Sequence, residues 1–207
     1  IALIELVNGT PDEQFRDAIF EVFDIEGLLY YYAVRIFTGD DDFVNHNYYL
    51  YQDLTSEMWE IIPWDLDKAF RPWLSETPID AGTVNNPING SSHPLISRVL
   101  DIPRCRHRYV EIHQELFATL LERDRFELLV DSLGALVVDD AARDVWRAHW
   151  NDEDLVEDSI EDVVEFRAER KALMEASYGG FLAGVDGLVI NEVLAWNTSV
   201  LADGHGE

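Results

Sequence analysis

Carboxylate and amide side chains gather at two places in the first third of the sequence. Three consecutive aspartates, Asp40 to Asp42, are followed by Asn47, and the pair Asp65 and Asp67 comes later. Carboxylate and amide oxygens are the ligands that Mg²⁺ or Mn²⁺ prefers, with phosphate oxygens and water completing the shell. A carboxylate can also take a proton from a reacting hydroxyl. The two loops are therefore candidates for a metal-dependent site.

Two strand-like runs separate the acidic loops. Residues 47–53 and 58–65 are rich in Tyr, Trp, Ile and Leu, and a short polar turn joins them. This pattern predicts a β-hairpin. A hairpin brings the residue before its first strand close to the residue after its second. Asp42, Asn47 and Asp65 are therefore expected to converge.

The order of these residues is that of a protein kinase site. There an Asp accepts the proton of the substrate hydroxyl, an Asn five residues later holds a metal, and a later Asp holds the metals. Asp42, Asn47 and Asp65 fit this order. Asp40 and Asn45 have the same spacing of five, so spacing alone leaves both registers open.

Helical patterns precede the first acidic loop. Residues 1–10 have the pattern of the end of a strand, and Thr10 to Glu13 form a capping box with Pro11 at the first helical position. Asp24 is placed to cap a second helix, which is apolar on most sides and which Gly39 ends.

The second half of the sequence is predicted to be mainly helical. A loop rich in Asn, Gly, Ser and Pro covers residues 72–94, and helical patterns follow to Tyr178. Breaks are expected near Pro103, near residues 123–124 and near residues 139–140.

Composition excludes several classes of function. The 207 residues carry 41 acids and 15 bases, a net charge of −26, so nucleic acid is not expected as a partner. No apolar run approaches about 18 residues, so this segment is expected to contain no membrane span. The single Cys105 excludes an internal disulfide and a cysteine zinc site.

Three stretches carry a family resemblance. "TGDDDFVNHNYYLYQD", "MWEIIPWDLDKAF" and "HPLISRVLDIPRCRHRYVEIHQELFATLL" resemble the active-site core and the next segment of the CotH-type kinases, the family of the spore-coat protein kinase. The family pattern has a Gly-Asn-x-Asp loop, a His-Asn-Tyr-Tyr-Leu-Tyr strand, an Ile-Pro-Trp-Asp-Leu-Asp strand end and an Asn-Pro-Leu-Ile helix start. The likeness covers roughly residues 24–178.

The resemblance implies a fold and a set of roles. The fold would be α+β and mostly helical, an atypical protein-kinase-like C-terminal lobe with an active-site β-hairpin. Asp42 matches the catalytic aspartate, Asn47 and Asp65 match residues that bind the metal and the nucleotide, and Asp67 is a further candidate ligand. The implied cofactors are ATP and Mg²⁺ or Mn²⁺. Asp40 and Asp41 depart from the family, which usually has Asn and often Trp there.

The resemblance also implies a reaction, transfer of the ATP γ-phosphoryl group to Ser or Thr of a surface or coat protein. The location would be extracytoplasmic or at the cell surface of a bacterium. The phosphate cover and the Lys–Glu pair that a kinase needs would lie upstream of Ile1, so this segment alone is expected to be inactive. Two alternatives stay open: a non-catalytic surface or adhesion module that keeps the fold, and a metal-dependent hydrolase that uses the same carboxylates.

Four units are predicted along the chain. Residues 1–10 would end a preceding region, 11–178 would be the CotH-like lobe, and 179–187 a linker. Residues 188–207 resemble the opening of a lamin-tail domain, which would make them the first strand of an immunoglobulin-like β-sandwich.

Overall fold

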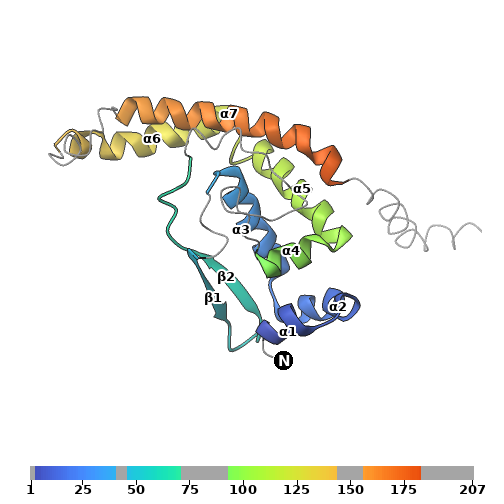
Figure 1. Ribbon diagram of the computed structural model, residues 1–207. Helices are drawn as coiled ribbons and strands as arrows, with labels where there is room; N and C mark the ends of the chain where they lie inside the picture. The colour runs from blue at the N-terminus through green and yellow to red at the C-terminus, as the bar shows by residue number, and fades with distance from the viewer. Residues whose placement is uncertain (1–2, 41–45, 71–92, 144–155, 183–207) are drawn as a thin grey trace, which may run out of the picture.

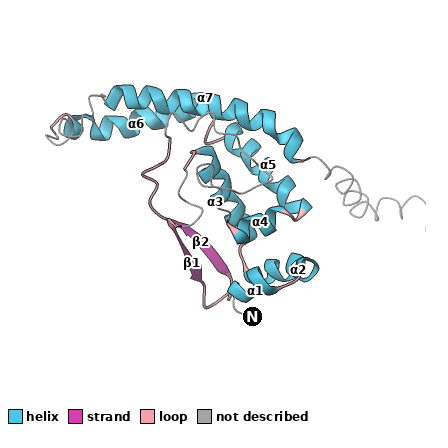
Figure 2. Cartoon of the chain, viewed as in Figure 1, coloured by secondary structure: helices cyan, strands magenta, loops and turns pink. Residues whose placement is uncertain are grey.

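The computed structural model describes residues 3–40, 46–70, 93–143 and 156–182. Within these ranges the fold is mostly helical with one two-stranded antiparallel sheet (Figures 1 and 2), which confirms the predicted α+β class. The elements in chain order are α1 (Leu3–Gly9), α2 (Asp12–Val22), α3 (Ile25–Phe37), β1 (Tyr48–Gln52), β2 (Trp59–Pro63), α4 (Pro94–Leu100), α5 (Pro103–Ala118), α6 (Arg123–Ala141) and α7 (Val156–Phe181).

The first described element, α1, is a helix, so the predicted strand end is wrong. Leu3, Leu6 and Val7 are buried at helical spacing in α1. The predicted capping box is wrong as well, because Pro11 occupies the N-cap of α2 and no side-chain cap bond forms there. The helical conformation of α1 is stabilised by the burial of its apolar stripe against the rest of the fold, and this outweighs the β-propensity of its residues.

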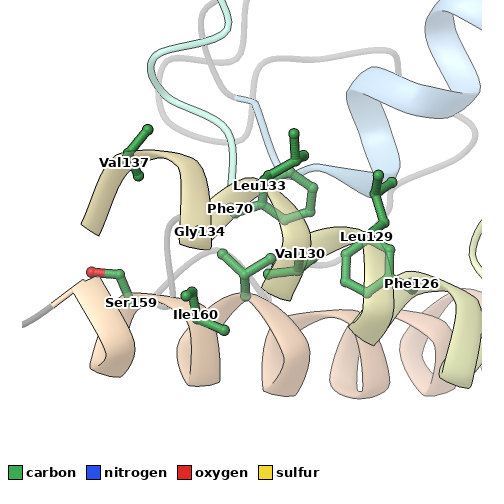
Figure 3. Close-up of a pocket in the computed structure, with 10 residues that line it drawn as sticks. Phe70, Phe126, Leu129, Val130, Leu133, Gly134, Val137, Ser159 and Ile160 are labelled. Atoms are coloured by element: carbon green, nitrogen blue, oxygen red, sulfur yellow. The ribbon is translucent and has the colours of Figure 1, made fainter. Parts of the chain in front are cut away.

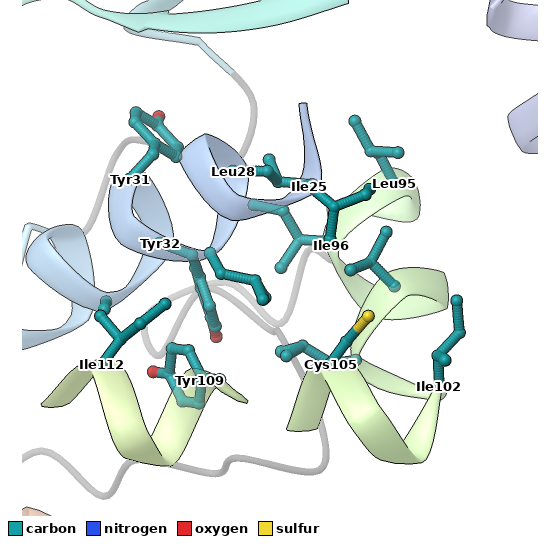
Figure 4. Packing of buried hydrophobic residues seen from close by; sticks show 14 of the residues in the cluster. Ile25, Leu28, Tyr31, Tyr32, Leu95, Ile96, Ile102, Cys105, Tyr109 and Ile112 are labelled. Atoms are coloured by element: carbon teal, nitrogen blue, oxygen red, sulfur yellow. The ribbon is translucent and has the colours of Figure 1, made fainter. Parts of the chain in front are cut away.

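Helix α3 lies in the core, between α4, α5 and the hairpin (Figure 1). Figure 4 shows the side chains of Leu28 and Tyr32 on α3 directed toward those of Ile96 and Tyr109 on the neighbouring helices. Tyr32 and Tyr109 stack with their ring centroids 5.2 Å apart. The almost continuous apolar content of α3 is explained by this burial on several sides.

Both ends of α3 are capped as the sequence predicts. The Asp24 carboxylate accepts a hydrogen bond from Gly27 N at 3.0 Å. At the other end Gly39 adopts φ 64°, which L side chains rarely tolerate. Gly39 N donates to Ile36 O at 3.3 Å and Asp40 N donates to Arg35 O at 3.2 Å, the two bonds of a Schellman motif.

The cap at Asp24 also begins the joint between α3 and the hairpin, because Asp24 N donates to Trp59 O at 2.8 Å. Asp24→Ala removes only the side-chain cap and is expected to lower the free energy of unfolding by about 1 kcal/mol. Asp24→Asn keeps an acceptor and serves as the matched control. Urea titration of both variants checks the difference, and equal losses would show that the cap does not stabilise α3.

The later helices match the predicted breaks. Breaks occur at Pro103 and at Arg123, and α6 ends at Ala141, next to the break expected near residues 139–140. Helix α7 runs past Tyr178 to Phe181, so it extends into the first residues of the predicted linker. The rest of the predicted linker, the lamin-tail-like residues 188–207 and most of the predicted loop at 72–94 lie outside the described residues and stay predictions.

Helices α6 and α7 lie side by side in opposite directions (Figure 1). Arg167 on α7 donates from Nε to Leu121 O at 2.7 Å, and Arg170 donates from Nη2 to Ile36 O at 2.7 Å. Both arginines are buried. Through Arg170, α7 therefore contacts the C-terminal end of α3, where the helix dipole favours a positive charge.

Candidate functional site

The hairpin brings Asn47 and Asp65 to the same end of the sheet. Tyr48 pairs with Pro63 in the antiparallel register, and Trp64 N donates to Asn47 O at 3.1 Å just beyond the ladder. Asp65 follows Trp64 directly. The predicted convergence is therefore confirmed for Asn47 and Asp65, while Asp42 lies outside the described residues.

Both converging residues have an unusual backbone. Asn47 adopts φ 64° and Asp65 adopts φ 51°, in the left-handed region. Asn and Asp enter this region more easily than most residues, yet each such residue is strained relative to glycine. Strained residues persist where their surroundings hold them, and they concentrate at functional sites. Contacts with the rest of the fold are therefore expected to hold Asn47 and Asp65 in this conformation.

A buried arginine that sequence reasoning missed holds both residues in place. Arg35, in the last turn of α3, is 1% exposed. Its Nη2 donates to Asn47 O and to Trp64 O, each at 2.7 Å, and its Nη1 lies 3.5 Å from Asp65 O. One guanidinium group therefore bridges the end of the first acidic loop and the start of the second.

Asp40 is the counter-ion of this arginine. Its carboxylate accepts a hydrogen bond from Arg35 Nη1 and the residue is 3% exposed. The Tyr31 ring lies 5.4 Å from the guanidinium, and burial raises the pKa of Tyr31 to about 12, so the phenol stays neutral. A carboxylate that is buried and paired in this way is not placed to take a proton from a substrate. The geometry therefore favours the register that begins at Asp42.

The second acidic loop is held at both ends. Trp64 O accepts from Arg35 at the start, and Phe70 N donates to Thr38 O at 2.7 Å at the end. The Phe70 ring packs between rings of α3, α6 and α7, with centroids 6.0 Å from Phe37, 6.3 Å from Phe126 and 5.6 Å from Phe166. The exposed carboxylates of Asp65 and Asp67 thus belong to a loop whose ends are packed on the core.

The outer face of the hairpin presents exposed apolar side chains beside this loop, with Glu60 opposite Tyr51 on the same face. Tyr49, Tyr51 and Ile62 alternate onto that face by strand register, and Trp64 continues it. Trp64 is 57% exposed, although tryptophan side chains are on average highly buried. Tyr49 and Trp64 meet edge to face at 5.6 Å. We call Tyr49, Tyr51 and Trp64 the aromatic face.

Asn47, Asp65 and Asp67 are the described residues that could hold a metal ion at the hairpin. They supply hard oxygen donors from two loops, as Mg²⁺ and Mn²⁺ require, and phosphate oxygens and water commonly supply the rest. Within the described ranges, no three His, Cys, Asp or Glu side chains come together closely enough to form a site by themselves.

A hollow lies between α6 and α7 (Figure 3). Its lining is formed almost entirely by apolar side chains, among them Phe70, Phe126, Leu133 and Ile160, with the Ser159 hydroxyl at its margin. This lining offers no carboxylate for metal or acid–base chemistry. The hairpin loops therefore remain the better candidate for a catalytic site.

The described helices include none that is both long enough and apolar enough to span a bilayer.

By its fold the protein is a mostly helical α+β domain in which a β-hairpin joins two loops rich in carboxylate and amide side chains. Comparison with known families identifies the family to which it belongs. A family model described as CotH kinase protein matches residues 1–174. The chain belongs to the CotH family. Inner spore coat protein H of Bacillus subtilis (strain 168) is 27% identical over 125 residues, which are 60% of this chain. The matched region is 34% of that relative, so the chain spans about one third of its length.

Proposed function

We propose that the full-length protein is an atypical protein kinase that transfers the γ-phosphoryl group of ATP to a Ser or Thr hydroxyl. The observation that carries this proposal is the convergence of Asn47 with Asp65 at one end of the hairpin, held by Arg35. Membership of a family described as kinase proteins supports the reaction class.

The roles follow from the chemistry of phosphoryl transfer, which depends on positioning and on charge stabilisation. Asp42 would orient the acceptor hydroxyl and take its proton. Asn47 and Asp65 would hold Mg²⁺ or Mn²⁺, with Asp67 as a further ligand. When bound, the metal supplies the positive charge that offsets the phosphate oxygens, which the carboxylates alone would repel.

The aromatic face supports a nucleotide as the ligand. Tyr49 and Trp64 present exposed rings beside the loop that carries Asp65. Aromatic side chains bind nucleobases by stacking, each stack contributing about 1–3 kcal/mol. A ligand with a base at one end and phosphates at the other suits this arrangement.

The acceptor is proposed to be a coat or surface protein of a bacterium. This rests on the relative whose name identifies it as an inner spore coat protein. The corresponding location is extracytoplasmic or in the coat.

Asp65→Asn in the full-length protein tests the proposal. The variant is expected to lose phosphoryl transfer from labelled ATP and to bind Mn²⁺ at least tenfold more weakly, because the amide lacks the charge of the carboxylate. Asp131→Asn, at an exposed position on α6, makes the same change of charge and should leave both properties within twofold of the parent.

Two results would point to the alternatives. Mn²⁺ binding with release of inorganic phosphate but no phosphorylated protein would favour a metal-dependent hydrolase. Neither metal binding nor transfer in the parent protein would favour the non-catalytic module.

A further inference from the structure

We propose that Arg35 is a positioning residue that sets the spacing between the two loops of the candidate site, with Asp40 as its counter-ion. The inference deepens the proposed function, since those loops are the proposed metal and phosphoryl-transfer site. Arg35 acts through main-chain carbonyls of Asn47 and Trp64 and does not use the Asp65 carboxylate.

The geometry requires an arginine. The guanidinium Nη2 binds two carbonyl oxygens from different loops at 2.7 Å, while Nη1 binds the Asp40 carboxylate. A planar group with several fixed N–H donors can serve all three acceptors at once. A lysine ammonium is a single point of charge and cannot fix the same spacing.

The position of Arg35 couples the two acidic loops. Asp40 stands two residues before the proposed catalytic Asp42, and the Schellman motif folds Asp40 back over the last turn of α3. Trp64 stands immediately before Asp65. A shift of Arg35 would therefore displace Asn47 and the residues next to Asp65, and catalytic constellations tolerate displacements of only about 0.5 Å.

The full-length protein offers a matched control. Arg98 also binds main-chain carbonyls and a carboxylate, with Nη1 at 2.6 Å from Val7 O, Nη2 at 2.7 Å from Thr10 O and Nη2 at 2.7 Å from Asp12 Oδ1. These contacts join α1, α2 and α4 and involve neither acidic loop. Arg98→Met therefore removes a comparable set of bonds away from the candidate site.

The experiment compares Arg35→Lys, Arg35→Met and Arg98→Met by Mn²⁺ titration with electron paramagnetic resonance, by phosphoryl transfer, and by hydrogen exchange of peptides covering residues 46–52 and 59–70. Arg35→Lys should bind Mn²⁺ at least tenfold more weakly and show at least tenfold faster exchange in both peptides, and higher Mg²⁺ should restore part of its activity. Arg98→Met should match the parent in Mn²⁺ affinity and in these peptides, although it unfolds at a lower temperature.

The outcomes separate this inference from the proposed function. If the parent binds Mn²⁺ without any transfer, the kinase proposal fails while the effect of Arg35 on metal affinity still decides the inference. If the parent binds no metal, the exchange of the two peptides decides it. Unchanged Mn²⁺ affinity and exchange in a folded Arg35 variant would overturn the positioning role. Global unfolding of both Arg35 variants, with Arg98→Met folded, would overturn it as well and make Arg35 a residue of stability alone.

Discussion

Asp40→Ala should destabilise the domain severely, whereas Asp42→Asn should abolish phosphoryl transfer in a protein that still binds nucleotide. The two aspartates are two residues apart in one acidic run. Their expected roles differ because Asp40 is buried and paired with Arg35, whereas the kinase-like register assigns the proton-accepting role to Asp42.

The effect at Asp40 follows from the charge that it leaves behind. Without the carboxylate, Arg35 remains 1% exposed with a full positive charge and no counter-ion. Breaking a buried pair by removing one partner costs about 3–5 kcal/mol, which is a large part of the 5–15 kcal/mol that stabilises a typical domain. The carbonyls that Arg35 binds compensate only part of this loss.

Asp40→Asn is the matched control for Asp40→Ala. The family pattern has Asn at this position, and the amide oxygen can still accept from Arg35. We therefore expect Asp40→Asn to recover more than half of the stability that the alanine variant loses. Guanidinium titrations followed by circular dichroism measure both. Equal stability of Asp40→Ala and the parent would mean that the ion pair contributes nothing to the fold.

The effect at Asp42 is one of activity. Asn cannot take the proton of the acceptor hydroxyl, so transfer should fall by 10²-fold or more while nucleotide affinity stays within a fewfold. Single-turnover transfer and a nucleotide-binding titration on the full-length protein separate the two properties. Loss of turnover in Asp40→Asn together with normal turnover in Asp42→Asn would reverse the assignment of the register.

The hairpin and the caps of α3 could be predicted because their signals are local. The strand runs on either side of a short turn predict the hairpin, in which the structure pairs Tyr48 with Pro63. Gly39 is the residue type that a Schellman motif favours. The convergence of Asn47 and Asp65 then follows from hairpin geometry alone. These are the parts of the site in which short-range pattern and final contact coincide.

Arg35 could not be predicted in the same way because its partners are distant in sequence. Its acceptors lie 12 and 29 residues away, and no periodicity encodes them. A signal does exist, since a single arginine in the apolar part of the helix that follows Glu26 indicates a buried charge that needs a partner. The exposure of Trp64 could not be predicted either, because its residue type suggests the core while the alternation that continues from β2 puts its side chain on the outer face.

His93 shows how the structure explains a departure from the family pattern. The family pattern starts this helix with Asn-Pro-Leu-Ile, and this chain has His93 where the pattern has Asn. His93 caps α4, because its Nδ1 accepts a hydrogen bond from Ile96 N at 3.4 Å. Its ring also lies 5.1 Å from that of Tyr48, next to the candidate site. The imidazole can accept this bond only while Nδ1 carries no proton.

Acidification should therefore destabilise the domain through His93 and through the buried His113. Burial lowers the pKa of each to about 4 from the ordinary 6.5. Below pH 6.5 these two histidines bind protons in the unfolded chain, whereas in the folded chain they stay neutral down to about pH 4. The contribution of the neutral histidines to the free energy of unfolding is therefore complete above pH 6.5 and is lost as the pH falls from 6.5 to 4. Each histidine should remove about 2 kcal/mol between pH 7 and pH 5.

His93→Asn separates this effect from the titration of the many carboxylates, which the two proteins share. Asn is among the best N-cap residues and does not titrate, so the variant should be within about 1 kcal/mol of the parent at pH 7. Its loss of unfolding free energy between pH 7 and pH 5 should be smaller than that of the parent by about 2 kcal/mol, because one of the two buried histidines is gone. Urea titrations at both pH values give the comparison. An equal loss of unfolding free energy in the parent and in His93→Asn would contradict the prediction. It would show that the fold does not lower the pKa of His93.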